Sequence, residues 1–137
     1  MFTNGKIDRK KLGDLVFSNP DLKKKLEALT HPKIKSEILN LFNKHKNDKF
    51  IFVSVPLLYE AGFDDIFDKV LVIKVEDNIQ LERLMKRNNL TKDEALIRIN
   101  SQMPQSEKEN RADYIISNNS TLENLESEIK NFIASIY

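Results

Sequence analysis

The spacing of apolar positions predicts helices in the first third of the chain and strands that alternate with helices in the remainder. In the first third, leucines recur at i, i+4 and i+7, which is the spacing of one face of a helix. Asp8 and Asn19-Pro20 are start signals for two helices, because an Asp or Asn side chain caps the first turn and proline suits its first position. Thr30-His31-Pro32 predicts a third start. We therefore expect residues 6–47 to form an all-helical subdomain.

Three short apolar runs predict strands in the remainder of the chain. They are Phe50–Val55, Lys69–Val75 and Tyr114–Ser117, and such β-branched runs are typical of strands that are covered on both faces. Ser120 with Glu123 forms a capping box for a final helix that carries the clearest apolar stripe in the chain. Strands that alternate with helices indicate a parallel sheet with right-handed crossovers.

Polar residues mark the helices that are expected between the second and third strands. Asp77 can cap the first of these helices, and Asn88-Asn89 breaks it. Thr91 with Glu94 forms a capping box for the next helix. Met103-Pro104 stops that second helix.

The run Val-Pro-Leu-Leu-Tyr-Glu-Ala-Gly at residues 55–62 directly follows the first predicted strand. Proline cannot continue a central ladder, so the chain must leave the sheet at Pro56. Apolar residues and one carboxylate, Glu60, then stand at the carboxyl end of a parallel strand, where open α/β sheets bind ligands. The alternative interpretation is an ordinary loop that happens to be apolar.

Composition excludes several classes of site. The 137 residues carry a net charge of +1, no Trp and only 8% aromatic residues, so neither a basic field nor stacking platforms indicate nucleic acid. The absence of cysteine excludes disulfides, thiolate metal ligands and a cysteine nucleophile. No apolar run approaches the roughly 20 residues that span a bilayer, and we expect a cytoplasmic protein.

The sequence predicts no metal site. His31 and His45 are the only histidines, and their spacing does not resemble that of metal ligands. Asp64-Asp65 and Asp68 could bind a cation, but carboxylates of this kind more often cap helices or face water.

Motifs spread over nearly the whole chain occur in a recognisable order. They are Lys6–Arg9, Leu26-Glu27, His31-Pro32, Val55–Gly62, Gln80–Arg87, Glu94-Ala95, Arg98-Ile99, Gln102–Pro104 and Arg111–Asn118. In this order and spacing they resemble the bacterial dephospho-CoA kinases, whose Pro-Leu-Leu-Phe-Glu-Ala-Gly segment is similar to residues 56–62. Each motif alone is weak, and their order and spacing carry the resemblance.

The resemblance implies an activity and a fold. The family transfers the terminal phosphate of ATP to the 3′-hydroxyl of dephospho-CoA, in the last step of CoA biosynthesis. Its α/β fold is a P-loop kinase-like parallel sheet. In this chain it implies a helical CoA-side subdomain over residues 1–47, a sheet core over 48–85 and 103–137, and a helical lid over 86–102. The implied partners are dephospho-CoA or CoA, with no nucleic acid and no membrane.

The phosphate loop of that family is missing from these residues. The only glycines are Gly5, Gly13 and Gly62, and none precedes Lys-Ser or Lys-Thr. A phosphate cradle needs consecutive backbone N–H groups, a lysine and a Mg²⁺-binding hydroxyl. The aspartate general base that the resemblance implies is missing too. We therefore expect a chain truncated at its N-terminus, without the first two strands of the sheet, that is inactive by itself and does not bind the family's ATP and Mg²⁺ tightly.

The alternative function is a non-catalytic module that binds CoA, another nucleotide or a partner chain. A different P-loop small-molecule kinase is a third alternative, which His31-Pro32 and the Pro-Leu-Leu-Tyr-Glu segment disfavour. An absent strand would leave the predicted strands at 50–55 and 69–75 with unpaired edges. We therefore expect a rearranged sheet, self-association through those edges or marginal stability.

The resemblance also assigns two groups of candidate site residues. The candidates for contact with ATP are Arg83, Arg87, Arg98, Gln102 and Asn118. Arginine suits this role because its planar fork binds phosphate at two points and keeps its charge. The candidates for contact with the acceptor are His31, Pro32, Leu58, Tyr59 and Glu60. Each has a structural alternative: a solvated helix face for the arginines, a turn for Asn118, and a core position for the leucine.

Overall fold

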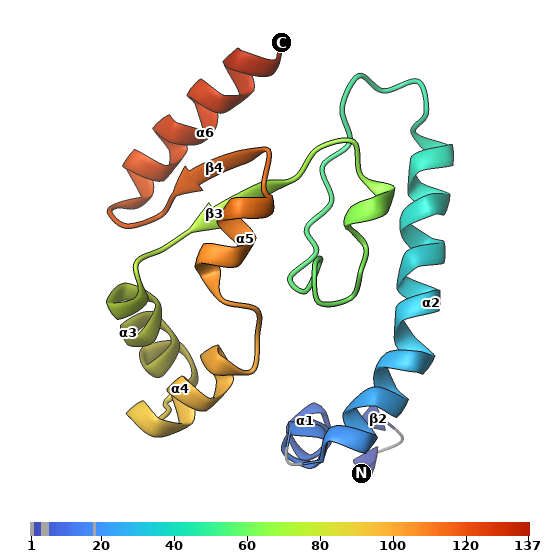
Figure 1. Ribbon diagram of the computed structural model, residues 1–137, viewed down its shortest axis with the longest axis vertical. Helices are drawn as coiled ribbons and strands as arrows, with labels where there is room; N and C mark the ends of the chain where they lie inside the picture. The colour runs from blue at the N-terminus through green and yellow to red at the C-terminus, as the bar shows by residue number, and fades with distance from the viewer. Residues whose placement is uncertain (1, 4–5, 18) are drawn as a thin grey trace. The chain divides into compact units, whose positions relative to one another are not determined.

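The computed structural model describes residues 2–3, 6–17 and 19–137, and it divides the chain into two compact units. The first unit is Met1–Val55 and the second is Pro56–Tyr137. Figure 1 shows their elements in chain order, coloured from blue at the N-terminus to red at the C-terminus. Gly5, one of the three glycines, lies outside the described residues.

The first unit consists of a short hairpin and two helices. Strands β1 (Phe2–Thr3) and β2 (Lys6–Ile7) pair antiparallel, and helices α1 (Arg9–Phe17) and α2 (Pro20–Lys44) contact each other. Asp8 precedes α1 as predicted, and its Oδ1 accepts a 3.1 Å hydrogen bond from the backbone N–H three residues on. The expectation of helix from residue 6 onward is therefore wrong at its start, where backbone pairing with β1 holds two residues extended.

Helix α2 is one continuous helix, and the predicted restart at Thr30-His31-Pro32 is wrong. Asn19 caps its start by accepting from two backbone N–H groups at 3.0 and 3.1 Å, with Pro20 in the first turn as predicted. Pro32 lies inside the helix. Proline's fixed φ is compatible with a helix, but the missing N–H and the crowding of its ring against the carbonyl four residues earlier together cost about 3 kcal/mol. Strong helical stretches on both sides extend the helix past that single break, because propagation is easy once a helix has nucleated.

The predicted strand at Phe50–Val55 is wrong. Residues 50–55 adopt no strand among the described elements, and Phe52 is 64% exposed. Apolar β-branched residues identify a segment that could enter a sheet, but a strand forms only where a neighbour supplies the ladder of hydrogen bonds. The two sheets that the structure describes are β1–β2 and a parallel pair in the second unit.

The second unit is built on two parallel strands. Strand β3 (Leu71–Lys74) pairs with β4 (Tyr114–Ser117), in the register Leu71↔Tyr114 to Lys74↔Ser117. The bounds of β4 are those predicted, and β3 lies inside its predicted range. Parallel pairing requires a long crossover, and residues 75–113 supply it.

Helices lie against both strands of this pair (Figure 1). Helix α6 (Leu122–Ile136) packs on β4, and α5 (Gln105–Arg111) packs on β3. Tyr114 meets Phe132 of α6 edge-on at 5.2 Å, whereas Lys74 pairs with Glu109 of α5 at 3.4 Å. Since Tyr114 aligns with Leu71, three residues before Lys74, these contacts lie on opposite faces of the pair.

The crossover begins with a helical hairpin. Helix α3 (Asp77–Asn88) ends at Asn89, whose φ of 51° is left-handed, and α4 (Lys92–Asn100) begins after the predicted capping box of Thr91 and Glu94. Asn tolerates that conformation better than most residues, which explains why the Asn-Asn pair ends α3. Asp77 is the first residue of α3 rather than its cap, and the cap position belongs to the preceding glutamate.

In the second unit, one helix was missed and one predicted cap is displaced. Helix α5 was not predicted, because its sequence Gln-Ser-Glu-Lys-Glu-Asn-Arg has no apolar periodicity. The predicted cap at Ser120 is displaced by one residue, since Thr121 accepts from the Asn124 N–H at 3.4 Å. Ser120 instead accepts from the Asn124 side chain at 2.9 Å. A short 3-10 turn, η1 (Asp64–Ile66), precedes β3.

The described core is small. Its buried apolar residues are Ile38 in the first unit and Tyr59, Phe63, Ala95 and Ile116 in the second. The two-stranded sheet also leaves Ile73 51% exposed and Ile115 44% exposed. No helix among the described residues is both long and apolar enough to cross a membrane.

Adjacent isoleucines on β4 give a matched test of this packing. Ile116 is 3% exposed and Ile115 is 44% exposed, because neighbouring strand residues face opposite sides. Ile116→Ala should lower the free energy of unfolding by about 2–4 kcal/mol, and Ile115→Ala by less than about 1 kcal/mol. Urea unfolding followed by circular dichroism measures both changes. Equal losses would contradict the assigned faces.

The amino ends of β3 and β4 are joined by one carboxylate, which predicts an acid-sensitive fold. Asp113 accepts from Lys69 Nζ and from the Val70 N–H, both at 2.8 Å. These two hydrogen bonds hold the pKa of Asp113 below its ordinary 3.8. A lowered folded pKa stabilises the native state above the unfolded pKa, and this stabilisation is lost as pH falls through the folded value.

Asp113→Asn should therefore lower the urea midpoint near pH 6, and its difference from the parent chain should shrink as pH falls below 3.8. Asp68→Asn, at an exposed aspartate of the same unit, is the control and should follow the parent chain. A gap between Asp113→Asn and the parent that stays constant down to strong acid would contradict the assignment.

Candidate functional site

A cleft opens at the carboxyl end of β3, beside the helical crossover. Its volume is about 660 Å³, and its lining includes Lys74, Gln80, Asn100, Gln102, Gln105 and Asn119. This position is where open α/β sheets bind ligands, and the volume suits a small organic molecule. Five amide side chains and two lysines, Lys74 and Lys108, supply donors, and the apolar wall comes from α4 and Met103-Pro104.

Charges in the cleft are largely paired within the protein. Lys74 Nζ donates to Glu109 Oε2 at 3.4 Å, and the Glu76 carboxylate accepts from Asn119 Nδ2 at 3.2 Å. Gln105 differs, because its Nε2 is buried and meets no hydrogen-bond partner in the described part of the chain. Such a donor is costly unless something pairs with it, so Gln105 is a candidate for contact with a ligand.

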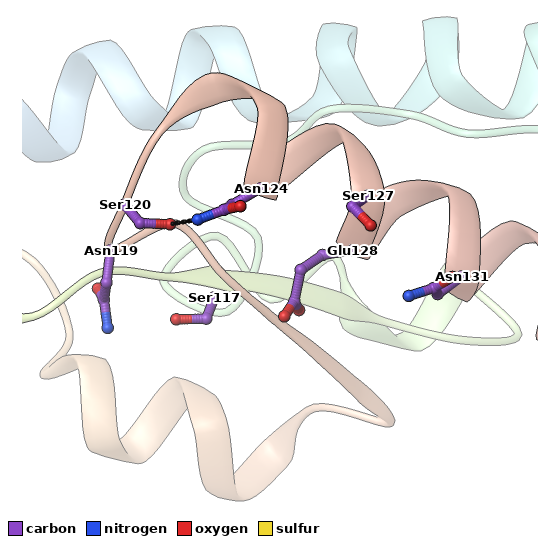
Figure 2. A pocket seen from close by; sticks show the side chains of 7 residues that line it. All are labelled: Ser117, Asn119, Ser120, Asn124, Ser127, Glu128 and Asn131. Atoms are coloured by element: carbon purple, nitrogen blue, oxygen red, sulfur yellow. Dashed lines mark hydrogen bonds between the residues drawn. The ribbon is translucent and has the colours of Figure 1, made fainter.

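A second hollow is a polar groove between α6 and the loop that follows β4 (Figure 2). Its volume is about 270 Å³, and α6 contributes Asn124, Ser127, Glu128 and Asn131, at the spacing of one helix face. Figure 2 shows Glu128 reaching from α6 toward Ser117 of β4. Amides and hydroxyls dominate the lining, so the groove suits a neutral group with both donors and acceptors rather than an anion.

The predicted lid residues fall into two kinds. Arg83 Nη1 donates to the Asn118 carbonyl at 2.7 Å and Nη2 to the Ser120 carbonyl at 3.3 Å, which ties α3 to the loop after β4. Arg87 is exposed near the end of α3 and donates from Nε to Asn88 Oδ1 at 2.9 Å. Arg98 is exposed on α4. All three arginines are exposed, and Arg83 differs in bonding backbone carbonyls that lie 35 and 37 residues away in the chain.

The other two predicted nucleotide contacts lie near the two hollows. Gln102 lines the cleft just beyond α4. Asn118 continues the strand ladder, since its N–H donates to the Lys74 carbonyl at 2.8 Å. It directly precedes Asn119 and Ser120, which line the polar groove.

The segment after Pro56 is a single helical turn closed by glycine. Phe63 N–H donates to the Leu58 carbonyl at 2.9 Å and Gly62 N–H to the Tyr59 carbonyl at 3.1 Å, which is the pattern of a Schellman motif. Gly62 has a φ of +64°, as the motif requires. This turn fixes the directions of Leu58, Tyr59 and Glu60.

Tyr59 is buried beneath an arginine. It is 8% exposed, and the Arg111 guanidinium lies 4.2 Å from its ring centroid. Arg111 also donates to Asp64 Oδ2 at 2.7 Å. Burial raises the pKa of Tyr59 despite this positive charge. Its hydroxyl is buried with no hydrogen-bond partner in the described structure. Arg111 thus covers one face of the Tyr59 ring, and the hydroxyl is the group of this side chain that could bond a ligand.

Glu60 is paired inside the protein. Its Oε1 lies 2.8 Å from Lys108 Nζ and accepts from the Met103 N–H at 3.0 Å. Burial acts to raise the pKa of Glu60, but hydrogen bonds from Lys108 and from the Met103 backbone outweigh it and lower that pKa. Lys108 was not predicted as a partner, because its helix carries no apolar pattern that places it in the fold.

The remaining acceptor candidates, His31 and Pro32, belong to the first unit. Both lie in the middle of α2, where His31 is half-buried and Pro32 is exposed. No group of three or more His, Asp or Glu side chains in the described part of the chain could hold a metal ion.

Comparison with known proteins places the chain in a family. The sequence model of the family described as dephospho-CoA kinase matches residues 1–124. The chain is 42% identical over 132 residues to a dephospho-CoA kinase of Lactobacillus johnsonii, covering 95% of this chain and 67% of the relative. It is 46% identical over 123 residues to one of Geobacillus kaustophilus, covering 88% and 61%.

Solved structures agree with these sequence matches. A dephospho-CoA kinase from Campylobacter jejuni matches with a TM-score of 0.67 and 38% identity, covering 99% of this chain and 68% of that one. The protein TT1252 from Thermus thermophilus matches with a TM-score of 0.78 and 32% identity, covering 98% and 70%. The chain thus spans about two-thirds of the length of these proteins. On the family match and these relatives, the chain belongs to the dephospho-CoA kinase family.

Proposed function

We propose that these 137 residues provide the acceptor-binding and lid parts of a dephospho-CoA kinase. In the proposed reaction, the 3′-oxygen of dephospho-CoA forms a bond to the γ-phosphorus of ATP. The bond from that phosphorus to the β–γ bridging oxygen breaks, and the hydroxyl proton is released. The observation that best supports the proposal is the cleft of about 660 Å³ at the carboxyl end of β3, flanked by the α3–α4 hairpin.

Arg87 is the proposed phosphate contact of the lid. It is exposed close to the turn between α3 and α4, so a change in the position of that hairpin would move it farther than residues near the sheet. Its planar, permanently charged fork can bind two phosphate oxygens, where charge develops during phosphoryl transfer. Arg98 is the second candidate on the same hairpin, and Gln102 and Gln105 would supply amide hydrogen bonds from the cleft.

The polar groove beside Asn118 is the proposed place for the adenine ring. A nucleobase is neutral and carries both donors and acceptors, which matches the amides and hydroxyls of the groove. In the second unit, the acceptor candidates are Leu58 and Tyr59, whose buried hydroxyl would contribute a hydrogen bond. In the first unit, the family resemblance alone supports His31 and Pro32 as acceptor candidates.

The sequence also supports a role without turnover. It holds no Gly-Lys-Ser or Gly-Lys-Thr, so these residues by themselves lack the cradle that positions the β- and γ-phosphates. Of the three carboxylates in the lining of the cleft, Glu109 pairs with Lys74 and Glu76 accepts from Asn119, and together with Asp77 they do not form a group that could hold a metal ion in the described part of the chain. We therefore propose that the 137-residue polypeptide binds its acceptor but needs a phosphate loop from other residues for catalysis.

Two measurements on the 137-residue chain test this proposal. A coupled assay with ATP, Mg²⁺ and dephospho-CoA should show no turnover above background. Calorimetric titration should show binding of dephospho-CoA, with weaker binding of pantetheine, which lacks the nucleotide. Turnover would refute the need for a phosphate loop, and absence of dephospho-CoA binding would refute the acceptor role.

Arg87 can be tested in a chimera that joins the phosphate-loop segment of a matched relative to residue 1. Arg87→Ala should lower kcat by about 10²-fold, as expected when one donor to the developing charge is lost. Arg87→Lys should recover only part of this loss, because lysine keeps the charge without the fork. Lys86→Ala, at the neighbouring position, is the control and should keep kcat. An unchanged kcat in Arg87→Ala would remove Arg87 from the proposed site.

A further inference from the structure

The Met103 N–H marks the point where the α3–α4 hairpin joins the rest of its unit. At the end of α4, the Ser101 N–H donates to the Ile97 carbonyl and the Gln102 N–H to the Ile99 carbonyl, both at 3.1 Å. The next amide, Met103, turns away from the helix and donates to Glu60 Oε1 at 3.0 Å. The acceptor therefore comes from 43 residues earlier in the chain and not from the helix itself.

The same carboxylate oxygen holds the helix that follows. Glu60 Oε1 lies 2.8 Å from Lys108 Nζ, and the two side chains are only 22% and 15% exposed. Helix α5, which carries Lys108, is fixed further by the Arg111–Asp64 pair at 2.7 Å and the Lys74–Glu109 pair at 3.4 Å. Glu60 thus connects the end of α4 to an element that several contacts hold against the sheet.

The other end of the hairpin has its own attachment. Arg83 of α3 donates to the Asn118 and Ser120 carbonyls at 2.7 and 3.3 Å. Helices α3 and α4 otherwise contact each other, which makes the hairpin one body. The start of α3 is also attached, since Glu76 and Asn119 exchange hydrogen bonds of 2.8 and 3.2 Å. The hairpin is therefore held at Glu76 and Arg83 on its first helix and at Met103 after its second, while its tip at Asn88-Asn89 lies between them in the chain.

We propose that Glu60 is a positioning residue that fixes the base of the α3–α4 hairpin through the Met103 N–H, and that it does not contact the acceptor. The inference rests on the proposed function, in which this hairpin is the lid. It replaces the interpretation of Glu60 as part of the acceptor pocket. Phosphoryl transfer depends on placement of the charged groups around the phosphate, so a lid needs a fixed base.

A carboxylate is suited to this role for two reasons. It accepts several hydrogen bonds at once, so a single side chain can hold both an amide and an ammonium group. Its charge also compensates Lys108, which would otherwise be a mostly buried cation without a partner.

Amide hydrogen exchange of the whole 137-residue chain, resolved by NMR, tests the attachment. In Glu60→Ala, the Met103 amide should exchange about tenfold faster, because its acceptor is lost, while β3 and β4 keep their protection. Glu60→Gln should rescue Met103 protection, since its amide oxygen is an isosteric acceptor. Glu60→Asp, which keeps the charge but is one methylene shorter, should fail to rescue it. Glu107→Gln, at an exposed glutamate of α5, is the matched control.

The contrast between the Gln and Asp variants decides the question even if Glu60→Ala does not fold. The proposal would be overturned if the Met103 amide exchanged as slowly in Glu60→Asp as in the parent chain. It would also be overturned if this amide exchanged as fast in Glu60→Gln as in Glu60→Asp. Dephospho-CoA titration gives an independent answer, because a positioning residue predicts an affinity within about twofold of the parent for Glu60→Gln, whereas a direct acceptor contact predicts a loss of about tenfold or more.

The two proposals fail in different ways. If the parent chain binds no dephospho-CoA, the proposed function fails, and the exchange of Met103 still shows whether Glu60 anchors the hairpin. If the parent chain binds dephospho-CoA and Glu60→Gln does not, the proposed function of the chain stands, and the proposal that Glu60 only positions the hairpin is overturned.

Discussion

The second unit depends on the parallel pairing of β3 and β4. Parallel strands cannot be joined by a tight turn, so residues 75–113 must leave the sheet and return to the same end of it. That obligatory crossover is the α3–α4 hairpin followed by α5. The cleft lies where the crossover departs from β3, and the polar groove lies where the chain leaves β4. Both candidate hollows are thus consequences of one strand pairing and its direction.

The same pairing explains how charges are distributed around the site. Asp113 joins the amino ends of the strands, and the Asn118 N–H extends their ladder at the carboxyl ends. Between these points, α5 contributes Lys108, Glu109 and Arg111 to three separate ion pairs. A helix without an apolar face is held in place by charge–charge contacts, which is a packing solution that depends on partners distant in sequence.

Prediction from the sequence was accurate where local chemistry determines the structure. The bounds of β4, the capping box at Thr91 and the end of α3 at Asn88-Asn89 all follow from propensities of neighbouring residues. It failed where distant partners decide. Residues 50–55 have the composition of a strand, but they pair with no neighbouring strand in the described part of the chain. Pro32, which was expected to begin a new helix, lies inside α2.

The candidate site shows the same division. Family resemblance selected Arg83 and Glu60 for ligand contact, which stays a prediction, and no local pattern revealed their partners within the fold: the carbonyls after β4, the Met103 amide and Lys108. Gln102 could be placed near a ligand from the end of its helix, and it lines the cleft. Gln105 was missed, because it begins a helix with no periodic signal.

The thin core has a thermodynamic consequence. Five apolar residues are buried in the described part of the chain, and Ile73, Ile115 and Phe52 keep large areas in contact with water. The heat-capacity change of unfolding scales with the apolar area newly hydrated, so this polypeptide should have a small one. The free energy of unfolding should then vary little with temperature. If ligand binding makes the protein bury more of its own apolar surface, calorimetry should show a decrease in heat capacity that is larger than the apolar area of the ligand alone explains.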